Sequence, residues 1–329
     1  MSALASRLAA GRSPAVNPQG ARFEKVVIVR RRTELEDLVR RFNTVAQARF
    51  YLEHAGQDFA PIEAGHNRYQ QVLDGIRSTI PRGLKQQVIE RDQLVQFSFD
   101  PADLVVTVGP DGLVVNTAKY LDEQPIVAVN PDPGTIDGIL LPFTAERFSP
   151  ALHDTLQGES RIQAVSMAEA RLSDGQRLVA FNDLFIGPRT HVSARYQIRQ
   201  GDKTEEQSSS GLIVSTGAGS TGWLQSVYAG AAGVVAALGG QVTPPPKGGR
   251  IPWDADYLAF AVREPFPSKV TGTSLVFGII TRDEPLVLDS HMAEHGVIFS
   301  DGIEQDYVQF NAGVTATITL AERKAYLVA

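Results

Sequence analysis

Residues 103–121, DLVVTVGPDGLVVNTAKYL, decide how the first half of the chain folds. The run 103–108 is mostly apolar and predicts a strand that is buried on both faces. The glycines, proline and aspartate at 109–112 are turn formers and end that strand. A buried strand therefore stops at a tight turn that contains one carboxylate.

The residues after this turn leave two readings open. Leu113-Val114-Val115 favours a second strand, and so a hairpin, because β-branched residues are enriched in strands. Residues 117–121 favour a helix instead. In the helical reading Asp111 is exposed at the carboxyl end of the strand, where open α/β sheets bind their ligands.

The segments around this stretch are expected to alternate strands and helices. Thr33 and Glu36 form a capping-box pair at the start of a helix that we expect to run to about Glu53. A second helix is expected over 66–79, with strands over 26–29, 86–90 and 126–129. This alternation predicts an α/β domain with a parallel sheet over residues 23–145, preceded by a flexible N-terminus over residues 1–22.

The second half of the chain has the pattern of a β-rich domain. Short strands separated by turn residues are expected over 177–187, 192–200, 257–263, 273–281, 296–300, 306–310 and 314–320. Asp301-Gly302 is a turn signal, or a position near the ligand. We assign residues 146–329 to a β-rich, β-sandwich-like domain.

The composition excludes several classes of function. The 329 residues are 43% hydrophobic, which is enough for two cores, and the net charge of −6 argues against a nucleic-acid partner. The chain has no cysteine, which excludes disulfides and Cys-ligated zinc. No apolar run approaches the ~18 residues that span a bilayer, so we expect no membrane partner and a cytoplasmic protein.

A histidine pattern in the second half resembles a zinc-protease motif. His291-Met-Ala-Glu294-His295 matches the inverted form of that motif, which requires a long helix. The flanking residues leave no room for such a helix, so we expect a surface loop and no tightly bound metal.

A second segment carries chemistry at residues 208–223, SSSGLIVSTGAGSTGW. A short strand runs into a loop of glycines and hydroxyls, and a helix-compatible stretch follows to Leu238. Such a loop either cradles a phosphate or is a turn that caps the helix. The spacing Gly217-x-Gly219-x-x-Gly222 also fits a dinucleotide fingerprint, but residues 240–246 lack the acidic residue which that fold requires.

Three segments in order resemble the motifs of the NAD kinase family. Gly109-Pro-Asp-Gly112 is similar to the family's Gly-Gly-Asp-Gly-Thr signature, which its diacylglycerol-kinase relatives share. Residues 181–186, FNDLFI, resemble its Asn-Glu motif, and residues 209–223 resemble its Ser-Thr-Pro-Thr-Gly-Ser-Thr-Ala-Tyr segment. About 70 and about 30 residues separate the motifs, as in the family, and residues 129–142 are most similar to its mitochondrial type.

The resemblance implies two domains, with an active site between them that transfers a phosphoryl group from ATP, with Mg²⁺, to a hydroxyl of NAD or a related metabolite. It implies that Asp111 is the catalytic carboxylate. It further implies that small-molecule nucleotides are the partners and that the protein is a homo-oligomer. The nucleotide-binding residues that it implies are Gly109, Gly112, Asn182, Asp183, Ser210, Thr216, Gly217, Gly219, Ser220, Thr221 and Trp223.

Departures from the family pattern leave other hypotheses open. Pro110 stands where the family has glycine and Leu113 where it has threonine, which suits a nucleotide-binding member with weak catalysis. A sugar or a lipid is the alternative acceptor. The family's C-terminal tail, which returns to the first domain, is expected to be absent because the chain stops soon after the strand at 314–320.

Overall fold

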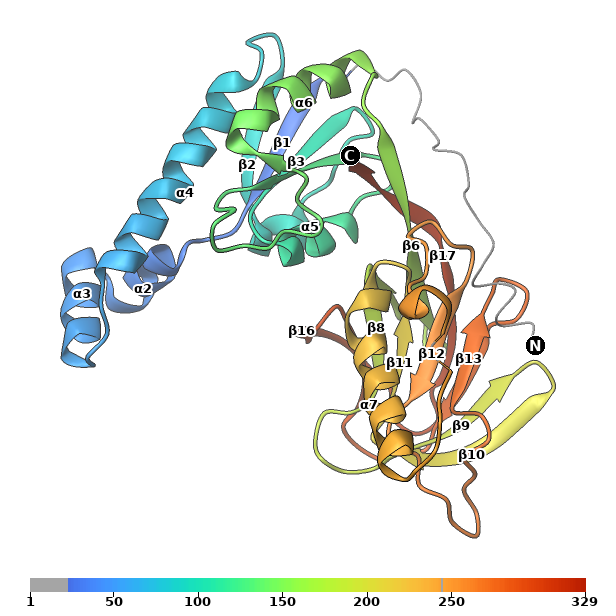
Figure 1. Cartoon of the computed structure of the whole chain (residues 1–329). Helices are drawn as coiled ribbons and strands as arrows, with labels where there is room; N and C mark the ends of the chain where they lie inside the picture. The colour runs from blue at the N-terminus through green and yellow to red at the C-terminus, as the bar shows by residue number, and fades with distance from the viewer. Residues whose placement is uncertain (1–22, 244) are drawn as a thin grey trace. The chain divides into compact units, whose positions relative to one another are not determined.

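The computed structural model describes residues 23–243 and 245–329 of the chain (Figure 1). The predicted flexible segment 1–22 lies outside the described residues. The chain divides into two compact units. The N-terminal unit contains residues 23–163 together with Tyr326–Ala329, and the C-terminal unit contains Ala164–Ala325.

A parallel sheet forms the centre of the N-terminal unit. Its strands lie in the order β4-β3-β1-β2, and β4 also pairs with β5. The strands are β1 (Lys25–Arg30), β2 (Lys85–Glu90), β3 (Asp103–Val108), β4 (Pro125–Asn130) and β5 (Phe143–Thr144). Every residue of β3 and β4 is buried, as expected for strands covered on both faces.

Helices cover both faces of this sheet (Figure 1). The helical segments of the unit are α2 (Glu34–Phe42), α3 (Val45–His54), α4 (Ala60–Thr79), η1 (Arg91–Gln96), α5 (Asp111–Ala118) and α6 (Ala145–Gln157). Helices α4 and α6 pack on the face that carries Val26, Val106 and Val127, and α5 lies on the opposite face. The α/β domain expected from the sequence is therefore confirmed.

The structure decides between the two readings of residues 103–121. Strand β3 ends at Val108, and α5 begins at Asp111 after an extended Pro110 with φ −73°. The apolar run after the turn is buried as a helix face, so the hairpin is excluded. Tertiary burial has outweighed the strand preference of Leu113-Val114-Val115.

The prediction of one helix from Thr33 to Glu53 is wrong, because this segment forms two helices, α2 and α3. Asn43 has φ 67° and ends α2, and the Thr44 side chain then accepts a hydrogen bond from the Gln47 N–H and caps α3. The capping box of Thr33 with Glu36 is confirmed. Helix α4 begins at Ala60, earlier than the expected residue 66, and α6 was not anticipated at all.

Two facing sheets form the C-terminal unit. One has the order β10-β9-β14-β17, with β6 paired to β17 and β7, and the other has the order β13-β12-β11-β8-β15-β16. Their strands are β6 (Ile162–Leu172), β7 (Arg177–Ala180), β8 (Asp183–Pro188), β9 (Ala194–Gln200), β10 (Lys203–Ser209), β11 (Leu212–Ser215), β12 (Leu258–Val262), β13 (Phe277–Ile280), β14 (Leu286–Ser290), β15 (Gly296–Ser300), β16 (Ile303–Gln309) and β17 (Thr315–Val328). Buried side chains of both sheets share one core, which includes Tyr196, Phe260 and Ile318, so the β-sandwich-like expectation is confirmed.

Strand β17 corrects the expectation that the C-terminal tail is absent. It continues to Val328, and Tyr326 and Leu327 pair with β4 in parallel. Those last residues belong to the N-terminal unit. The sequence prediction ended the last strand at residue 320, whereas the strand continues through the polar residues 322–324.

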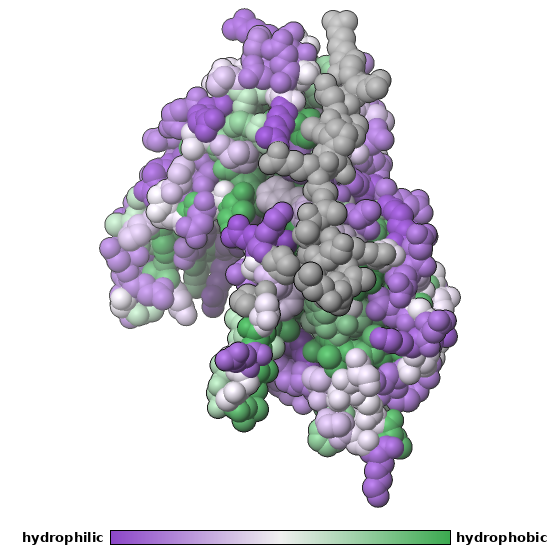
Figure 2. Space-filling view, turned by 45° about the vertical axis from the view of Figure 1, so that its right-hand side comes forward, coloured by the Kyte–Doolittle hydropathy of each residue, from purple (hydrophilic) through white to green (hydrophobic). Residues whose placement is uncertain are grey.

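One long helix of the C-terminal unit is unusually apolar. Helix α7 (Trp223–Ala237) follows the short η2 (Gly219–Thr221) and leaves Val234 largely exposed. No helix within the described residues is both long and apolar enough to cross a bilayer. On the face shown in Figure 2, hydrophilic residues dominate and hydrophobic surface occurs in separate patches.

Candidate active site

Asp111 is the first residue of α5, directly beyond the carboxyl end of β3. Its Oδ1 accepts a hydrogen bond from the Leu140 N–H at 2.6 Å, which fixes the side chain against the loop after β4. The residue is half-buried. A carboxylate at the first position of a helix is favoured by the positive end of the helix dipole. Asp111 is thus an ordered, accessible carboxylate.

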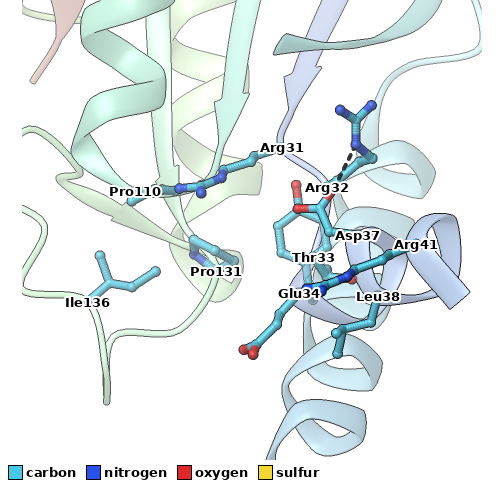
Figure 3. Close-up of a pocket in the computed structure, with 12 residues that line it drawn as sticks. Arg31, Arg32, Thr33, Glu34, Asp37, Leu38, Arg41, Pro110, Pro131 and Ile136 are labelled. Carbon is cyan, nitrogen blue, oxygen red and sulfur yellow. Dashed lines mark hydrogen bonds and ion pairs between the residues drawn. The ribbon is translucent and has the colours of Figure 1, made fainter. Parts of the chain in front are cut away.

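A cavity of about 560 Å³ opens beside this turn (Figure 3). Gly109 and Pro110 form part of one wall, the Arg31 side chain extends toward Pro110, and Arg41 lies on the side of α2. The ring of Tyr69 also lines the cavity. Burial raises the pKa of Tyr69 to about 12, and its hydroxyl donates to the Val108 carbonyl at 2.8 Å, so it is a fixed neutral wall.

Asn182 lies in the C-terminal unit just before β8, and Asp183 is the first residue of that strand. The backbone there is held by Asp301, whose carboxylate accepts hydrogen bonds from the N–H groups of Phe181, Asn182 and Asp183 at 2.6–3.3 Å. Asp301 occupies the left-handed region with φ 56° in the turn between β15 and β16. Sequence reasoning missed this bracing role, although Asp301-Gly302 was recognised as a turn.

Asp183 has an unusual environment for a carboxylate. Its Oδ1 is fully buried and has no hydrogen-bond partner among the described residues, although the residue as a whole is only half-buried. Burial raises the pKa of Asp183 to about 7, and the nearby Asp301 charge raises it further against a hydrogen bond from Ser215. The protonated carboxyl is therefore substantially populated at neutral pH.

The glycine loop is packed tightly against the rest of the unit. A Cβ on Gly217 would lie 1.9 Å from the Pro252 carbonyl oxygen, and one on Gly219 would lie 2.3 Å from the Asn182 carbonyl oxygen. The requirement for glycine at both positions is explained by contacts within the chain. The loop therefore rests directly on the Asn182–Asp183 segment.

The loop hydroxyls also bond within the chain. The Thr216 hydroxyl donates to the Phe181 carbonyl at 2.6 Å and accepts from the Gly219 N–H at 3.2 Å. The Ser220 hydroxyl donates to the Gly217 carbonyl and accepts from the Ile251 N–H. Neither hydroxyl caps α7, whereas Thr221 is exposed to solvent.

Ser210 and Trp223 line a second cavity, of about 680 Å³. Trp223 stacks on Phe185, with centroids 5.8 Å apart and planes 7° apart. The Arg263 guanidinium lies 5.4 Å from the Trp223 ring centroid. An aromatic wall beside cations is suited to a heterocyclic base that carries phosphate. The sequence reading missed Arg263 because it lies far from the loop in sequence.

The structure thus places the sequence-derived residues in two groups. Gly109, Asp111 and Gly112 belong to the N-terminal unit, and all the others belong to the C-terminal unit. The segment His291 to His295 is the loop between β14 and β15, as expected. No group of three or more histidine, aspartate or glutamate side chains suited to a metal ion occurs in the described part of the chain.

The chain is similar in sequence to curated NAD kinases. It is 34% identical over 139 residues to the NAD kinase of Heliobacterium modesticaldum, which covers 40% of this chain and 47% of that protein. It is 26% identical over 270 residues to the mitochondrial NAD kinase 2 of Rattus norvegicus, which covers 66% of this chain and 62% of that protein. The chain therefore spans about half the length of the first relative and under two thirds of the second. No protein-family model matches it.

Two solved structures share the fold over 93% of this chain. Yeast NADH kinase complexed with NADH superposes with a TM-score of 0.59 at 15% identity, over 83% of that chain. The NAD kinase from Archaeoglobus fulgidus in complex with ATP gives 0.53 at 17% identity, over 93% of that chain. Sequence matches and fold agree. The chain is similar in sequence to NAD kinases and shares their fold.

This similarity confirms the resemblance to NAD kinases drawn from three ordered motifs. The match to a mitochondrial NAD kinase 2 agrees with the subtype that residues 129–142 suggested. The roles of the individual site residues remain predictions for this chain.

Proposed function

We propose that this protein is an NAD kinase-like phosphotransferase, which moves a phosphoryl group from ATP to a hydroxyl of NAD or NADH. The observation that carries the proposal is the position of Asp111, which directly follows a buried parallel strand and opens a helix. Ligands of open α/β sheets bind at this edge. The relatives' names, NAD kinase and NADH kinase, support the same acceptor class.

The proposed phosphoryl transfer uses the accessible carboxylate of Asp111. The acceptor hydroxyl oxygen attacks the terminal phosphorus of ATP, the bond to the bridging oxygen breaks, and ADP leaves. Asp111 accepts the hydroxyl proton as the new phosphate ester forms. No further hydrogen bond of this carboxylate besides that from Leu140 is found in the described residues, so one oxygen is available for the proton. Phosphoryl transfer needs such positioning and charge neutralisation more than covalent catalysis.

We assign nucleotide binding to the residues that the sequence singled out. Trp223 and Ser210 would hold a base and its sugar in the aromatic cavity, with Arg263 beside them. Asn182 and Asp183 would bind ribose hydroxyls, and a protonated Asp183 suits this role because it can donate a hydrogen bond. The loop packs on the Asn182–Asp183 segment and so supports this surface through Thr216, Gly217, Gly219 and Ser220. Thr221 is exposed and is free to contact the ligand.

Mg²⁺ is part of the proposal. Magnesium is usually bound through one or two carboxylates and the phosphates of the substrate, while it keeps several waters. Asp111 fits that mode as the alternative to its role as proton acceptor, and the described residues offer no larger carboxylate or histidine cluster. When bound with ATP, the metal would neutralise charge on the phosphates. Homo-oligomerisation and a cytoplasmic location remain predictions of this proposal.

A binding protein without turnover is the second candidate. Pro110 supplies no N–H to the turn, and Leu113 is a buried side chain that packs over Gly109. These residues remove two polar groups from the position beside Asp111. That change would favour binding over catalysis.

The two candidates are separated by incubating the purified protein with ATP, Mg²⁺ and NAD and measuring NADP. We expect NADP and ADP in equal amounts. NADH, a sugar panel and diacylglycerol serve as further acceptors under the same conditions. Saturable NAD binding without product from any acceptor would establish the binding protein instead.

A further inference from the structure

We propose that the cavity beside Gly109–Pro110 binds the polyphosphate chain of the phosphoryl donor, with Arg31 and Arg41 as its charged ligands (Figure 3). The inference rests on the proposed function. In the sequence, Arg30-Arg31-Arg32 after the first strand fitted either a contact with nucleotide phosphates or a solvated helix start. The inference gives Arg31 the first role, adds Arg41 and gives Arg32 a structural role.

The register of the parallel sheet places Arg31 next to the turn at Gly109–Gly112. Arg30 of β1 lies opposite Val108 of β3, so Arg31 and Gly109 leave the same sheet edge side by side. In Figure 3 the Arg31 side chain extends toward Pro110. Asp111 follows that proline directly. A guanidinium at this place would hold phosphates beside the carboxylate that accepts the proton.

Arg31 and Arg41 are cations without a carboxylate partner in the described part of the chain. No ion pair joins Arg31 to another described side chain, and Arg41 contacts only the rings of Phe42 and Tyr51, at 5.1 and 5.8 Å. Both side chains are exposed to solvent, and both line the cavity. Two uncompensated guanidinium groups facing one cavity are suited to a polyanion.

Arg32 lies between Arg31 and Arg41 in the sequence, but its guanidinium is engaged in ion pairs. Its guanidinium is bound by Asp37 at 3.0 Å and also by Glu90 and Asp92, and these carboxylates raise its pKa. Its charge is therefore neutralised locally. Arg32 ties the start of α2 to the end of β2 and so holds the wall that presents Arg31 and Arg41.

The cavity also has apolar walls. Leu38 lies on the α2 side, and Ile136 and Pro131 lie across from it (Figure 3). These walls suit the base or sugar of a nucleoside triphosphate, whereas the arginines need only its phosphates. ATP and inorganic tripolyphosphate share the chain that the arginines would bind. Their comparison therefore separates the contribution of the nucleoside from that of the phosphates.

One acidic residue of the lining opposes anion binding. Asp37 is engaged by Arg32, which leaves Glu34 as the lining carboxylate without an ion pair among the described residues. Its removal should strengthen the binding of polyphosphate. The Glu34→Gln variant therefore tests the same site with the opposite sign.

The test is calorimetric titration of the full-length protein with inorganic tripolyphosphate and, separately, with ATP. We expect Arg31→Ala and Arg41→Ala each to weaken the binding of both ligands about tenfold or more, because each loses charge-assisted hydrogen bonds. Glu34→Gln should bind more tightly. Arg40→Ala is the matched control, since Arg40 is an exposed arginine of the same helix turn outside the cavity lining.

Two results would overturn the assignment: wild-type protein that binds neither ligand, or arginine variants that bind both as tightly as Arg40→Ala does. An unchanged thermal unfolding midpoint of the variants shows that the fold is retained. ATP that binds much more tightly than tripolyphosphate would place the nucleoside on the Leu38 and Ile136 walls. Equal affinities would show that only the phosphate chain is recognised there.

Kinetics separate this inference from the proposed function. If NADP is formed, Arg31→Ala should raise the KM for ATP and leave the KM for NAD within about twofold; an unchanged KM for ATP rejects the inference and keeps the kinase. If no acceptor is phosphorylated but tripolyphosphate binding depends on Arg31 and Arg41, the site stands without the kinase.

Discussion

At the scale of single residues, two predicted site carboxylates, one in each unit, differ in their surroundings. Asp111 is half-buried at a helix start and bonds to one backbone N–H. Asp183 has a buried oxygen without a partner and faces the charge of Asp301. One carboxylate is therefore suited to accept a proton, and the other is suited to hold one.

The raised pKa of Asp183 predicts how stability depends on pH. Its value is about 7 in the folded protein against 3.8 for the free side chain, so the folded state binds more protons between these values. Stability contributed by the protonated carboxyl is present below pH ~4 and is lost as the pH rises to ~7, by at most about 1.4 kcal/mol per pH unit. Asp183→Asn should remove this decline in denaturant unfolding.

The exposed Asp74 provides the control for that experiment. It lies on α4 and is largely exposed, so Asp74→Asn should leave the pH profile of the unfolding free energy unchanged. An identical decline between pH 4 and 7 in wild type and Asp183→Asn would show that Asp183 titrates normally.

At the scale of elements, the sequence predicted the strands better than the breaks between helices. Strands β1, β3 and β4 were expected within one or two residues, because their apolar runs are continuous. The break at Asn43 was not anticipated, since the apolar spacing of the segment continues through it. The choice between hairpin and helix at residues 113–118 required the sheet against which α5 packs.

The glycine loop yields a prediction at the same scale. Gly217→Ala forces a methyl group to 1.9 Å from the Pro252 carbonyl oxygen, so the backbone must shift, at a cost of about 1–3 kcal/mol. The matched control is Gly230→Ala within α7, where a methyl group meets nothing within 4 Å. That change should stabilise the protein by about 0.5–1 kcal/mol. Equal unfolding midpoints for the two variants would contradict the loop packing described above.

At the scale of the whole molecule, the chain crosses between its two units more than once. It passes into the C-terminal unit at Ala164 and returns at Tyr326. Leu327 and Val328 are buried there, and β17 pairs with β4. The sequence did not predict this return, because a strand that pairs with a distant partner leaves no local signal.

Deletion of Tyr326–Ala329 should weaken the N-terminal unit selectively. The loss of two buried apolar side chains is expected to cost about 3 kcal/mol or more. Hydrogen exchange should therefore accelerate at the amides of β3 and β4 and stay unchanged in β12 of the C-terminal unit. Deletion of the exposed Ala329 alone is the control. Unchanged protection of β4 after the larger deletion would show that the returning strand contributes no stability.

The resemblance to NAD kinases could be predicted from sequence because three short segments occur in a fixed order. The sequence did not predict the contacts that distant segments make with these motifs. Asp301 binds the backbone of residues 181–183, and Arg263 lies over Trp223. Neither partner lies near its motif along the chain. Local patterns therefore identified the motifs, whereas the tertiary structure supplied the residues that hold them in place.

The central claim is that Asp111 accepts a proton during phosphoryl transfer to NAD. Its most direct test is the steady-state rate of NADP formation from ATP, Mg²⁺ and NAD by Asp111→Asn relative to wild type. We expect kcat to fall by about two to four orders of magnitude, while the thermal unfolding midpoint is nearly retained. A folded Asp111→Asn variant that forms NADP at the wild-type rate would contradict the account.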